Sequence, residues 1–317
     1  MVGETGENLV FVLGLPRSGT TLLCALLASH EEVCCPPEPW VMLALESLGT
    51  TSPSHPADAQ VIGRAFRDFT GGGAPTPALR RFAADLYNHR LKKAGGSVMV
   101  DKTPRYYHVL PFIDRLFPRA KYLWLQRDPF DVAASYQKTW GIDLAGKAQS
   151  DPGDPASLDL LVGLPTLEAF ADEHADRVHA LRYEDLVEDP EGVLSRVYTF
   201  LGLRAAPVPE RPADSLFELK SASVGDKKIL ETAGVHRASV GAGLRSLSEE
   251  QLGSVYESVG AGALRSMGYV SSVEALRERG LEEPDEEATL DRRDRAAREL
   301  EARWSRVDSG SDIDADL

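Results

Sequence analysis

One short loop of this chain combines an arginine, two glycines and three hydroxyl side chains. It reads Gly14-Leu15-Pro16-Arg17-Ser18-Gly19-Thr20-Thr21. Its frame matches the nucleoside-triphosphate loop G-x-x-x-x-G-K-[ST], except that Thr20 stands where that loop has its lysine. The flanking residues predict a buried strand before the loop and a helix after it, so free N–H groups and the helix dipole attract an anion. The arginine and the missing lysine indicate an anion other than a metal-chelated triphosphate.

Polar or charged side chains follow each of five apolar runs that have strand character. Alternating buried strands and helices are typical of a parallel sheet with helices on both faces, where ligands bind outside the carboxyl ends of the strands. We therefore expect these groups to converge on one cleft. The runs and their groups are Leu9–Leu13 with the Arg17 loop, Val33–Cys35 with Glu38, Val98–Val100 with Asp101 and Lys102, Tyr122–Gln126 with Arg127 and Asp128, and Val178–Leu181 with Arg182 and Tyr183.

Two Asp-Pro pairs predict helix starts. Asp128-Pro129 supplies an N-cap and a proline at the first helical position for a helix through residues 131–137. Asp189-Pro190 does the same for a helix that Gly202 closes. Long irregular stretches in a compact domain are usually functional lids or disordered segments. Four stretches read as irregular: 49–59, 70–77, 141–155 and 205–243.

Composition limits the fold class and the partners. The 317 residues are 43% hydrophobic, enough for a sizeable core, and we favour one domain with helical insertions. The net charge of −14 argues against a nucleic-acid surface, so an anionic ligand must be held by a local basic cluster. Cys24, Cys34 and Cys35 give no disulfide framework and read as reduced, buried side chains.

The sequence shows no targeting or membrane-spanning segment. Residues 1–8 are acidic and polar, unlike a secretory signal, and no run of about 18 apolar residues is present. We therefore expect a cytoplasmic protein with no membrane partner.

The motifs together resemble those of the sulfotransferases that use 3′-phosphoadenosine 5′-phosphosulfate (PAPS), including the tyrosylprotein and carbohydrate branches. Residues 16–22 are similar to the family's 5′-phosphosulfate loop, and residues 126–136 to its 3′-phosphate element. Residues 101–104 resemble the Lys-Ser/Thr-Pro motif, and residues 182–186 a motif after a core strand. Residues 224–229 resemble the Gly-Asp-Pro-Lys loop of some bacterial members, although Lys227 replaces the proline.

The resemblance spans roughly residues 8–245 and implies a fold. We expect an α/β, P-loop-like, three-layer α/β/α architecture with a central parallel sheet and helical insertions. We place a sulfotransferase domain at residues 1–272. Residues 273–317 then form a charged C-terminal helix, about Thr289 to Val307, and an acidic tail.

The resemblance also implies which residues hold PAPS as co-substrate. Pro16, Arg17, Ser18, Gly19, Thr20 and Thr21 form the loop for its 5′ end. Arg127 and Ser135 grip the 3′-phosphate, since eight residues make slightly over two helical turns. Tyr183 approaches the adenosine, and Lys228 closes over a phosphate. No metal is required, and no His, Cys and carboxylate cluster has convincing ligand spacing.

Two catalytic residues follow from the same resemblance. Lys102 is the cation that stabilises charge on the sulfuryl and bridging oxygens, and Glu38 is the base that takes the acceptor's proton. His108 and His236 are the alternative bases. Structural readings remain open, in which Lys102 pairs with Asp101, Arg127 pairs with Asp128 or Asp131, and Glu38 faces solvent.

The predicted activity is in-line transfer of a sulfuryl group from PAPS to a hydroxyl. The acceptor is a small molecule, glycan, peptide or carrier-bound group, with specificity set by residues 41–96 and 137–173. One alternative is a decarboxylating sulfotransferase that acts on a carrier-bound β-hydroxyacyl chain in polyketide-type biosynthesis. A second is a non-catalytic protein that binds 3′-phosphoadenosine nucleotides. A P-loop kinase is disfavoured by Thr20 in place of lysine.

Overall fold

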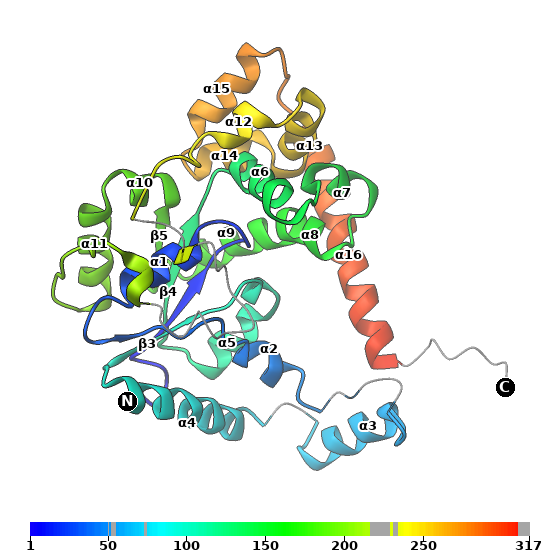
Figure 1. The fold of residues 1–317 in the computed structure, drawn as a ribbon. Helices are drawn as coiled ribbons and strands as arrows, with labels where there is room; N and C mark the ends of the chain where they lie inside the picture. Colours follow the sequence, from blue (N-terminus) through cyan, green and yellow to red (C-terminus); the bar gives the residue numbers. More distant parts are fainter. Residues whose placement is uncertain (50, 52–54, 73–74, 216–228, 231–233, 310–317) are drawn as a thin grey trace.

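The fold is built on a five-stranded sheet in which all neighbouring strands run parallel (Figure 1). The computed structural model describes residues 1–49, 51, 55–72, 75–215, 229–230 and 234–309, with only the backbone for 303–309. The strand order is β2-β3-β1-β4-β5, so β1 lies at the centre. The strands are β1 (Leu9–Leu13), β2 (Val33–Cys34), β3 (Val98–Lys102), β4 (Lys121–Gln126) and β5 (Val178–Arg182).

Helices cover both faces of the sheet, which explains why β1 and β3 are buried at every residue. Alternate side chains of β1 enter different cores: Phe11 packs in one and Val10 in the other. The first core takes side chains from α4 (Thr76–Ala94), α5 (Leu110–Leu116) and α9 (Leu164–Glu173). The second takes side chains from α1 (Thr20–Leu27), α10 (Tyr183–Glu188) and α11 (Pro190–Leu201). The predicted three-layer α/β/α fold is confirmed.

The predicted strands and capped helices are present. Helix α6 (Pro129–Trp140) begins where Asp128 accepts a hydrogen bond from the N–H of Phe130 at 2.9 Å. Asp189 caps α11 through Gly192 at 2.9 Å. The expectation of irregular structure through 141–155 is wrong, because α7 (Leu144–Ser150) lies within it. Asp143 caps this helix, and the helix buries Leu144, Ala145 and Ala148.

Shorter elements connect these layers. They are α2 (Val41–Glu46), α3 (Ala59–Phe69), the 3₁₀ helix η1 (Tyr106–Val109), α8 (Pro155–Leu158) and the π-helix η2 (Asp159–Gly163).

A helical subdomain follows at the C-terminal end. It contains α12 (Ala242–Ser246), α13 (Glu249–Val259), α14 (Ala261–Ser266), α15 (Val270–Glu278) and α16 (Glu286–Ser309). The expected boundary after residue 272 falls inside α15, whose Val273 and Leu276 belong to the first core. The expected charged helix is α16, and its Ala296 packs with Leu158 and Leu161. Residues 310–317 lie outside the described part.

Two sequence expectations concern cysteines and membrane spans. All three cysteines are buried and free of disulfide bonds. Within the described residues, no helix combines the length and the apolar character needed to cross a membrane.

Gly243 sits where α12 crosses α6, and we predict that this crossing does not tolerate a side chain. A Cβ at Gly243 would lie 2.3 Å from the backbone carbon of Phe130, and backbone cannot move aside cheaply. Gly243→Ala should therefore lower the free energy of unfolding by about 1–3 kcal/mol. Chemical denaturation measures this change.

Gly262→Ala is the matched control, because a Cβ at Gly262 in α14 would meet nothing within 4 Å. It should leave stability unchanged or raise it by up to about 1 kcal/mol. Equal unfolding free energies for the two variants would contradict the packing argument.

Candidate functional site

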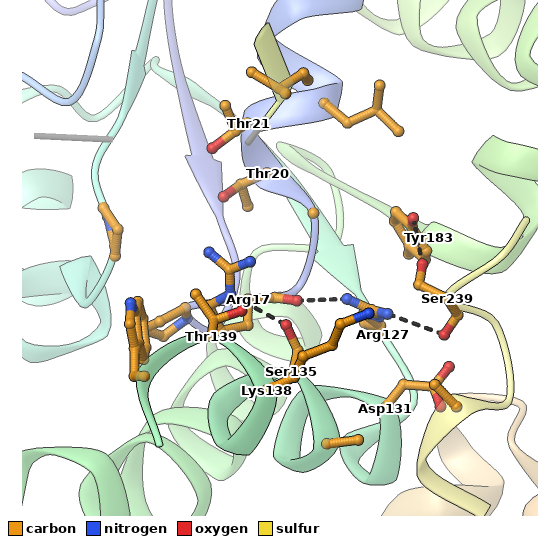
Figure 2. A pocket seen from close by; sticks show the side chains of 18 of the residues that line it. Arg17, Thr20, Thr21, Arg127, Asp131, Ser135, Lys138, Thr139, Tyr183 and Ser239 are labelled. Carbon is orange, nitrogen blue, oxygen red and sulfur yellow. Dashed lines mark hydrogen bonds between the residues drawn. The ribbon is translucent and has the colours of Figure 1, made fainter. Parts of the chain in front are cut away.

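A cavity of about 980 Å³ opens at the carboxyl edge of the sheet. Its walls come from the loop after β1, from α6, from the segments that follow β2 and β3, and from residues 234–246 (Figure 2). Predicted groups that follow four of the strands therefore line one cavity, as the parallel topology requires, whereas Asp101, Lys102, Asp128 and Arg182 are not among its lining residues. Of the predicted site residues, those that line the cavity are Pro16, Arg17, Gly19, Thr20, Thr21, Glu38, Arg127, Ser135 and Tyr183.

The loop after β1 is held tightly against the aromatic ring of Tyr183. Gly19 has a φ of +97°, and a Cβ there would lie 2.5 Å from that ring, so only glycine fits. The N–H of Ser18 donates to the carbonyl of Leu15 at 3.1 Å and closes a turn. Ser18 itself is buried beneath the loop, and its Oγ has no hydrogen-bond partner among the described residues. The loop delivers Thr20 and Thr21 to the start of α1.

One end of the cavity is a cluster of two arginines and two serines, which Figure 2 shows from close by. Arg17 Nε donates to Ser135 Oγ at 3.2 Å. Arg127 Nη1 donates to the carbonyl of Arg17 at 2.8 Å, and its Nη2 donates to the carbonyl of Ser239 at 3.2 Å. The guanidinium of Arg127 also lies 4.5 Å from the centre of the Tyr183 ring. These contacts fix two cations side by side.

Arg127 is held without a carboxylate. Asp131 accepts from the N–H groups of Gly241 and Gly243, at 2.8 and 2.7 Å, and Asp128 caps α6. Among the described residues no ion pair includes Arg127, and its buried Nε has no hydrogen-bond partner there. The alternative in which Arg127 forms an ion pair with Asp128 or Asp131 is therefore not observed. Its charge is available to an anion in the cavity.

The two predicted catalytic residues form a close ion pair. Lys102 Nζ lies 2.6 Å from Glu38 Oε1 and 3.4 Å from Thr21 Oγ1. Glu38 and Thr21 line the cavity, whereas Lys102 itself is only 3% exposed and is not among the lining residues. The alternatives left open by the sequence were an ion pair between Lys102 and Asp101 and a Glu38 side chain that faces solvent. In the structure Lys102 pairs with Glu38, whose side chain is only 11% exposed.

Asp101 positions this pair from behind. Its carboxylate accepts from the hydroxyls of Tyr87 at 2.5 Å and Tyr106 at 2.8 Å, and from Thr103 at 3.0 Å. Thr103 in turn accepts from the N–H of Trp40 at 3.1 Å, which ties the segment that carries Glu38 to the segment that carries Lys102. Burial raises the pKa of Asp101 to about 6, although the three hydroxyl hydrogen bonds favour the charged form.

Aromatic side chains and a third arginine also line the cavity, and the Arg17 guanidinium lies 5.3 Å from the centre of the Trp140 ring. Arg105 Nε and Nη2 donate to the two carboxylate oxygens of the buried Asp159 at 3.1 and 3.0 Å. Tyr107 and Tyr136 also donate to Asp159, at 2.8 and 2.5 Å. Asp159 opens the π-helix η2, a rare element that is frequent at functional sites. Arg105 itself is one of the residues that line the cavity.

Backbone strain is concentrated around the same cavity. In the described part of the chain, three non-glycine residues have a positive φ: Arg17 at 70°, Trp40 at 54° and Arg105 at 67°. All three line the cavity. Such residues persist where the surrounding structure over-determines them, and they cluster at functional sites.

The cavity is locally basic in an acidic protein. Its lining contains the cations Arg17, Arg105, Arg127 and Lys138 and the carboxylates Glu38 and Asp131, whereas the whole chain has a net charge of −14. This is the local basic cluster that an anionic ligand requires. Among the described residues, no group of three or more His, Cys, Asp and Glu side chains is arranged to hold a metal ion.

The two histidines considered as alternative bases occupy different environments. Burial lowers the pKa of His108 to about 4, with a contribution from Arg105, and His108 is not among the cavity-lining residues. His236 lines the cavity. Lys228 lies outside the described residues, together with the rest of the predicted 224–229 loop apart from Ile229.

Comparison with known proteins decides the family. The profile described as "Sulfotransferase family" matches residues 9–207. The chain belongs to this family. Nodulation protein NoeE of Sinorhizobium fredii is 36% identical over 287 residues, which are 86% of this chain and 68% of that protein. Protein-tyrosine sulfotransferase A of Caenorhabditis elegans is 26% identical over 208 residues, which are 61% of this chain and 50% of that protein.

Solved structures show the same fold. The sulfotransferase domain of the olefin synthase from Synechococcus PCC 7002 superposes with a TM-score of 0.55 at 24% identity, covering 78% of this chain and 92% of that domain. The sulfotransferase domain from the curacin biosynthetic pathway gives a TM-score of 0.53 at 23% identity, covering 73% and 88%. The architecture of this sulfotransferase is thus one already known in the family.

Sequence reasoning missed several residues of the sulfotransferase cavity. Ser239 holds both Arg127 and Tyr183, the latter through hydroxyls 2.9 Å apart, and it comes from a stretch that read as irregular. Arg105 adjoins the recognised motif at residues 101–104, but its partner Asp159 carries no local signal. Lys138 had a signal, since it follows Ser135 by three residues on the same helix.

We predict that Asp101 makes the stability of this sulfotransferase depend on pH. Its pKa in the folded protein, about 6, lies above the value of about 4 for an unfolded chain. Between these two pKa values, and just above the higher one, the folded state therefore holds more protons than the unfolded state. The stability contributed by Asp101 falls as pH rises through this range. Relative to Asp101→Asn, the wild type should lose about 1 kcal/mol of unfolding free energy between about pH 5.5 and about pH 7.5.

Denaturant titrations of both proteins across this range measure the difference. Wild-type and variant curves that run parallel would show that Asp101 does not titrate in this window. The comparison cancels the other titrating groups, including Asp128, whose pKa burial raises to about 7.

Proposed function

We propose that this sulfotransferase moves a sulfuryl group from PAPS to the hydroxyl of an acceptor. The observation that carries the proposal is the Lys102–Glu38 pair, 2.6 Å apart, at the wall of a cavity that also carries an arginine cluster and aromatic side chains. A cation for the leaving group and a carboxylate for the incoming hydroxyl are the two groups that in-line transfer needs.

The arginine cluster fits the nucleotide. Arg127 offers a buried Nε that no described residue satisfies, and Arg17 lies beside it against Ser135. We assign Arg127 and Ser135 to the 3′-phosphate, and Arg17, which donates to Ser135, to the 5′ end. The first N–H groups of α1, with Thr20 and Thr21, are assigned to the 5′-phosphosulfate. Tyr183 stacks under Arg127 and closes this end of the cavity.

The reaction exchanges one S–O bond for another. The bond from sulfur to the 5′-phosphate oxygen breaks and a bond from sulfur to the acceptor oxygen forms, which leaves 3′-phosphoadenosine 5′-phosphate. Glu38 accepts the hydroxyl proton, and the ammonium of Lys102 neutralises charge on the oxygens around sulfur. Thr21 Oγ1 lies 3.4 Å from Lys102 Nζ, so this hydroxyl links the loop after β1 to Lys102.

The part of the cavity wall formed by Trp40 and Arg105 is assigned to the acceptor, with Trp140 lying between it and Arg17. Ring surface beside one cation suits a hydroxyl compound with apolar and polar parts. The relatives differ in acceptor: one is named a protein-tyrosine sulfotransferase and another, Stf3 of Mycobacterium bovis, an omega-hydroxy-beta-dihydromenaquinone-9 sulfotransferase. We therefore propose a hydroxyl acceptor without choosing among peptides, glycans, small molecules and carrier-bound groups.

Product analysis separates the proposal from its rivals. A screen with PAPS over phenols, sugars, tyrosyl peptides and carrier-bound hydroxyacids, read by mass spectrometry, identifies a stable sulfate ester if the proposal holds. A terminal alkene from a β-hydroxyacyl carrier would instead indicate the decarboxylating reaction. A protein that only binds nucleotide needs neither Lys102 nor Glu38, and it would give no product.

We predict that Arg127 contributes strongly to nucleotide affinity. Arg127→Ala should raise the dissociation constant for 3′-phosphoadenosine 5′-phosphate at least about tenfold, the loss expected for a charged hydrogen bond. Isothermal titration calorimetry measures it. Arg119→Ala is the matched control, because the Arg119 side chain is 72% exposed and lies outside the cavity lining. Unchanged affinity in Arg127→Ala would remove this residue from the nucleotide site.

We predict that Lys102 acts on turnover more than on binding. Lys102→Ala should lower kcat at least about 100-fold while nucleotide binding stays measurable, since the cation acts on charge that develops in the transition state. Turnover is measured in a reaction with an acceptor found in the screen. Chromatography follows the release of 3′-phosphoadenosine 5′-phosphate. Lys147→Ala, which removes a surface ion pair with Asp154, should retain the wild-type rate. A wild-type rate in Lys102→Ala would overturn the catalytic assignment.

A further inference from the structure

Exposed apolar side chains gather in one part of the molecule. In the described part of the chain, nine large hydrophobic residues are exposed, and five of them fall between residues 48 and 86. Phe69 is 91% exposed and Phe82 is 54% exposed, far more than aromatic side chains normally are. The five are Leu48, Val61, Phe69, Phe82 and Leu86.

Helix α3 is amphipathic, yet none of its side chains is buried. At 100° per residue, Val61, Ala65 and Phe69 share one side of the helix. Arg64 and Arg67 lie on the other side, and both are exposed. Figure 1 shows α3 set apart from the sheet and its covering helices. Ile62 and Phe66 on the apolar side are half-buried, and the Phe66 ring lies against Gly49, so Val61, Ala65 and Phe69 are the apolar residues of α3 left exposed.

Helix α4 presents a second apolar stripe. Its inner side packs into the first core through residues that include Ala83 and Tyr87. Phe82 and Leu86, one turn apart, remain on the exposed side. Arg81, Lys92 and Lys93 are exposed on the same helix. Apolar and basic side chains are therefore interleaved on its outer surface.

The charge of this region is opposite to that of the chain. Residues 58–93 contain seven Lys and Arg against three Asp, a net charge of +4, whereas the whole chain carries −14. A basic segment with exposed apolar side chains thus stands out from an acidic protein. An anionic, partly apolar surface is complementary to it.

We infer that α3 and the outer side of α4 bind the surface of an anionic lipid membrane. Helices with a basic polar side and Phe or Leu on the other lie in the interface of a bilayer, with apolar side chains among the acyl chains and cations at the headgroups. A fluid bilayer needs no matching groove, which suits side chains that project from two separate helices. A folded acidic protein would need a complementary surface of fixed shape.

This surface is separate from the proposed nucleotide and acceptor cavity. None of its four helical apolar residues, Val61, Phe69, Phe82 and Leu86, is among the residues that line the cavity. The inference therefore does not depend on sulfuryl transfer. The expectation of no membrane partner rested on the lack of a spanning segment, and a helix that lies on a membrane surface needs none.

Vesicle sedimentation tests the inference with the full chain. The wild type should sediment with vesicles of phosphatidylcholine and phosphatidylglycerol, bind pure phosphatidylcholine vesicles more weakly, and dissociate as salt rises. Phe69→Ser combined with Phe82→Ser should weaken binding to the anionic vesicles at least about tenfold. Arg64→Glu combined with Arg67→Glu should weaken it and remove the preference for anionic lipid.

Val270→Ser combined with Leu290→Ser is the matched control, because these two side chains are 45% and 52% exposed on the C-terminal helices. It should bind vesicles as the wild type does. All substituted residues are exposed, so folding is retained, and circular dichroism verifies it. Failure of the wild type to bind anionic vesicles would overturn the inference and point to a protein partner. Equal binding to neutral vesicles, or equal loss in the control, would also overturn it.

Discussion

The parallel pairing of β1 with both β3 and β4 is the constraint on which the rest of the structure depends. It places Val12 beside Lys102 and Leu13 beside Trp124, so β1 and β3 end within one residue of each other and β4 continues two residues further, to Gln126. The chain must leave the buried sheet at this edge, where Arg17 and Arg127 follow β1 and β4 and Lys102 is the last residue of β3. No single loop could assemble this site. The cavity is therefore a property of the register of the sheet, and the side chains at its edge inherit their spacing from it.

Behind this edge, buried carboxylates fix the groups that line the cavity. Asp101 holds the segments of Lys102 and Trp40, Asp159 holds Arg105, and Asp131 holds the backbone at Gly241 and Gly243 next to the arginine cluster. Each accepts at least two hydrogen bonds, which offsets the cost of burying a charge. The acidity of the chain is thus partly structural. Asp101 and Asp159 lie behind the cavity wall, and among the residues that line the cavity the cations Arg17, Arg105, Arg127 and Lys138 outnumber the carboxylates Glu38 and Asp131.

Much of the fold could be predicted from sequence, because its signals are local. Apolar runs marked the strands, and Asp-Pro pairs marked α6 and α11. The site was predictable at the strand ends: Arg127 follows β4 directly, and Lys102, expected after a strand that ends at Val100, is the last residue of β3. It was not predictable where partners lie far apart: Arg105 and Asp159 are separated by 54 residues, and Arg127 and Ser239 by 112. Helix α7 was not predicted, because Gly146 and the polar residues of this short helix are typical of a loop.

The three left-handed residues at the cavity wall bear on how this protein responds to selection. A non-glycine residue in that conformation costs of order 1 kcal/mol or more, and Arg17, Trp40 and Arg105 share one cavity. Glycine at any of them would relieve backbone strain, and where this relief exceeds the cost of the added entropy of the unfolded chain it raises stability, but it removes a side chain from the wall. Selection for heat resistance alone would therefore erode the cavity first, at the positions where the fold is least relaxed.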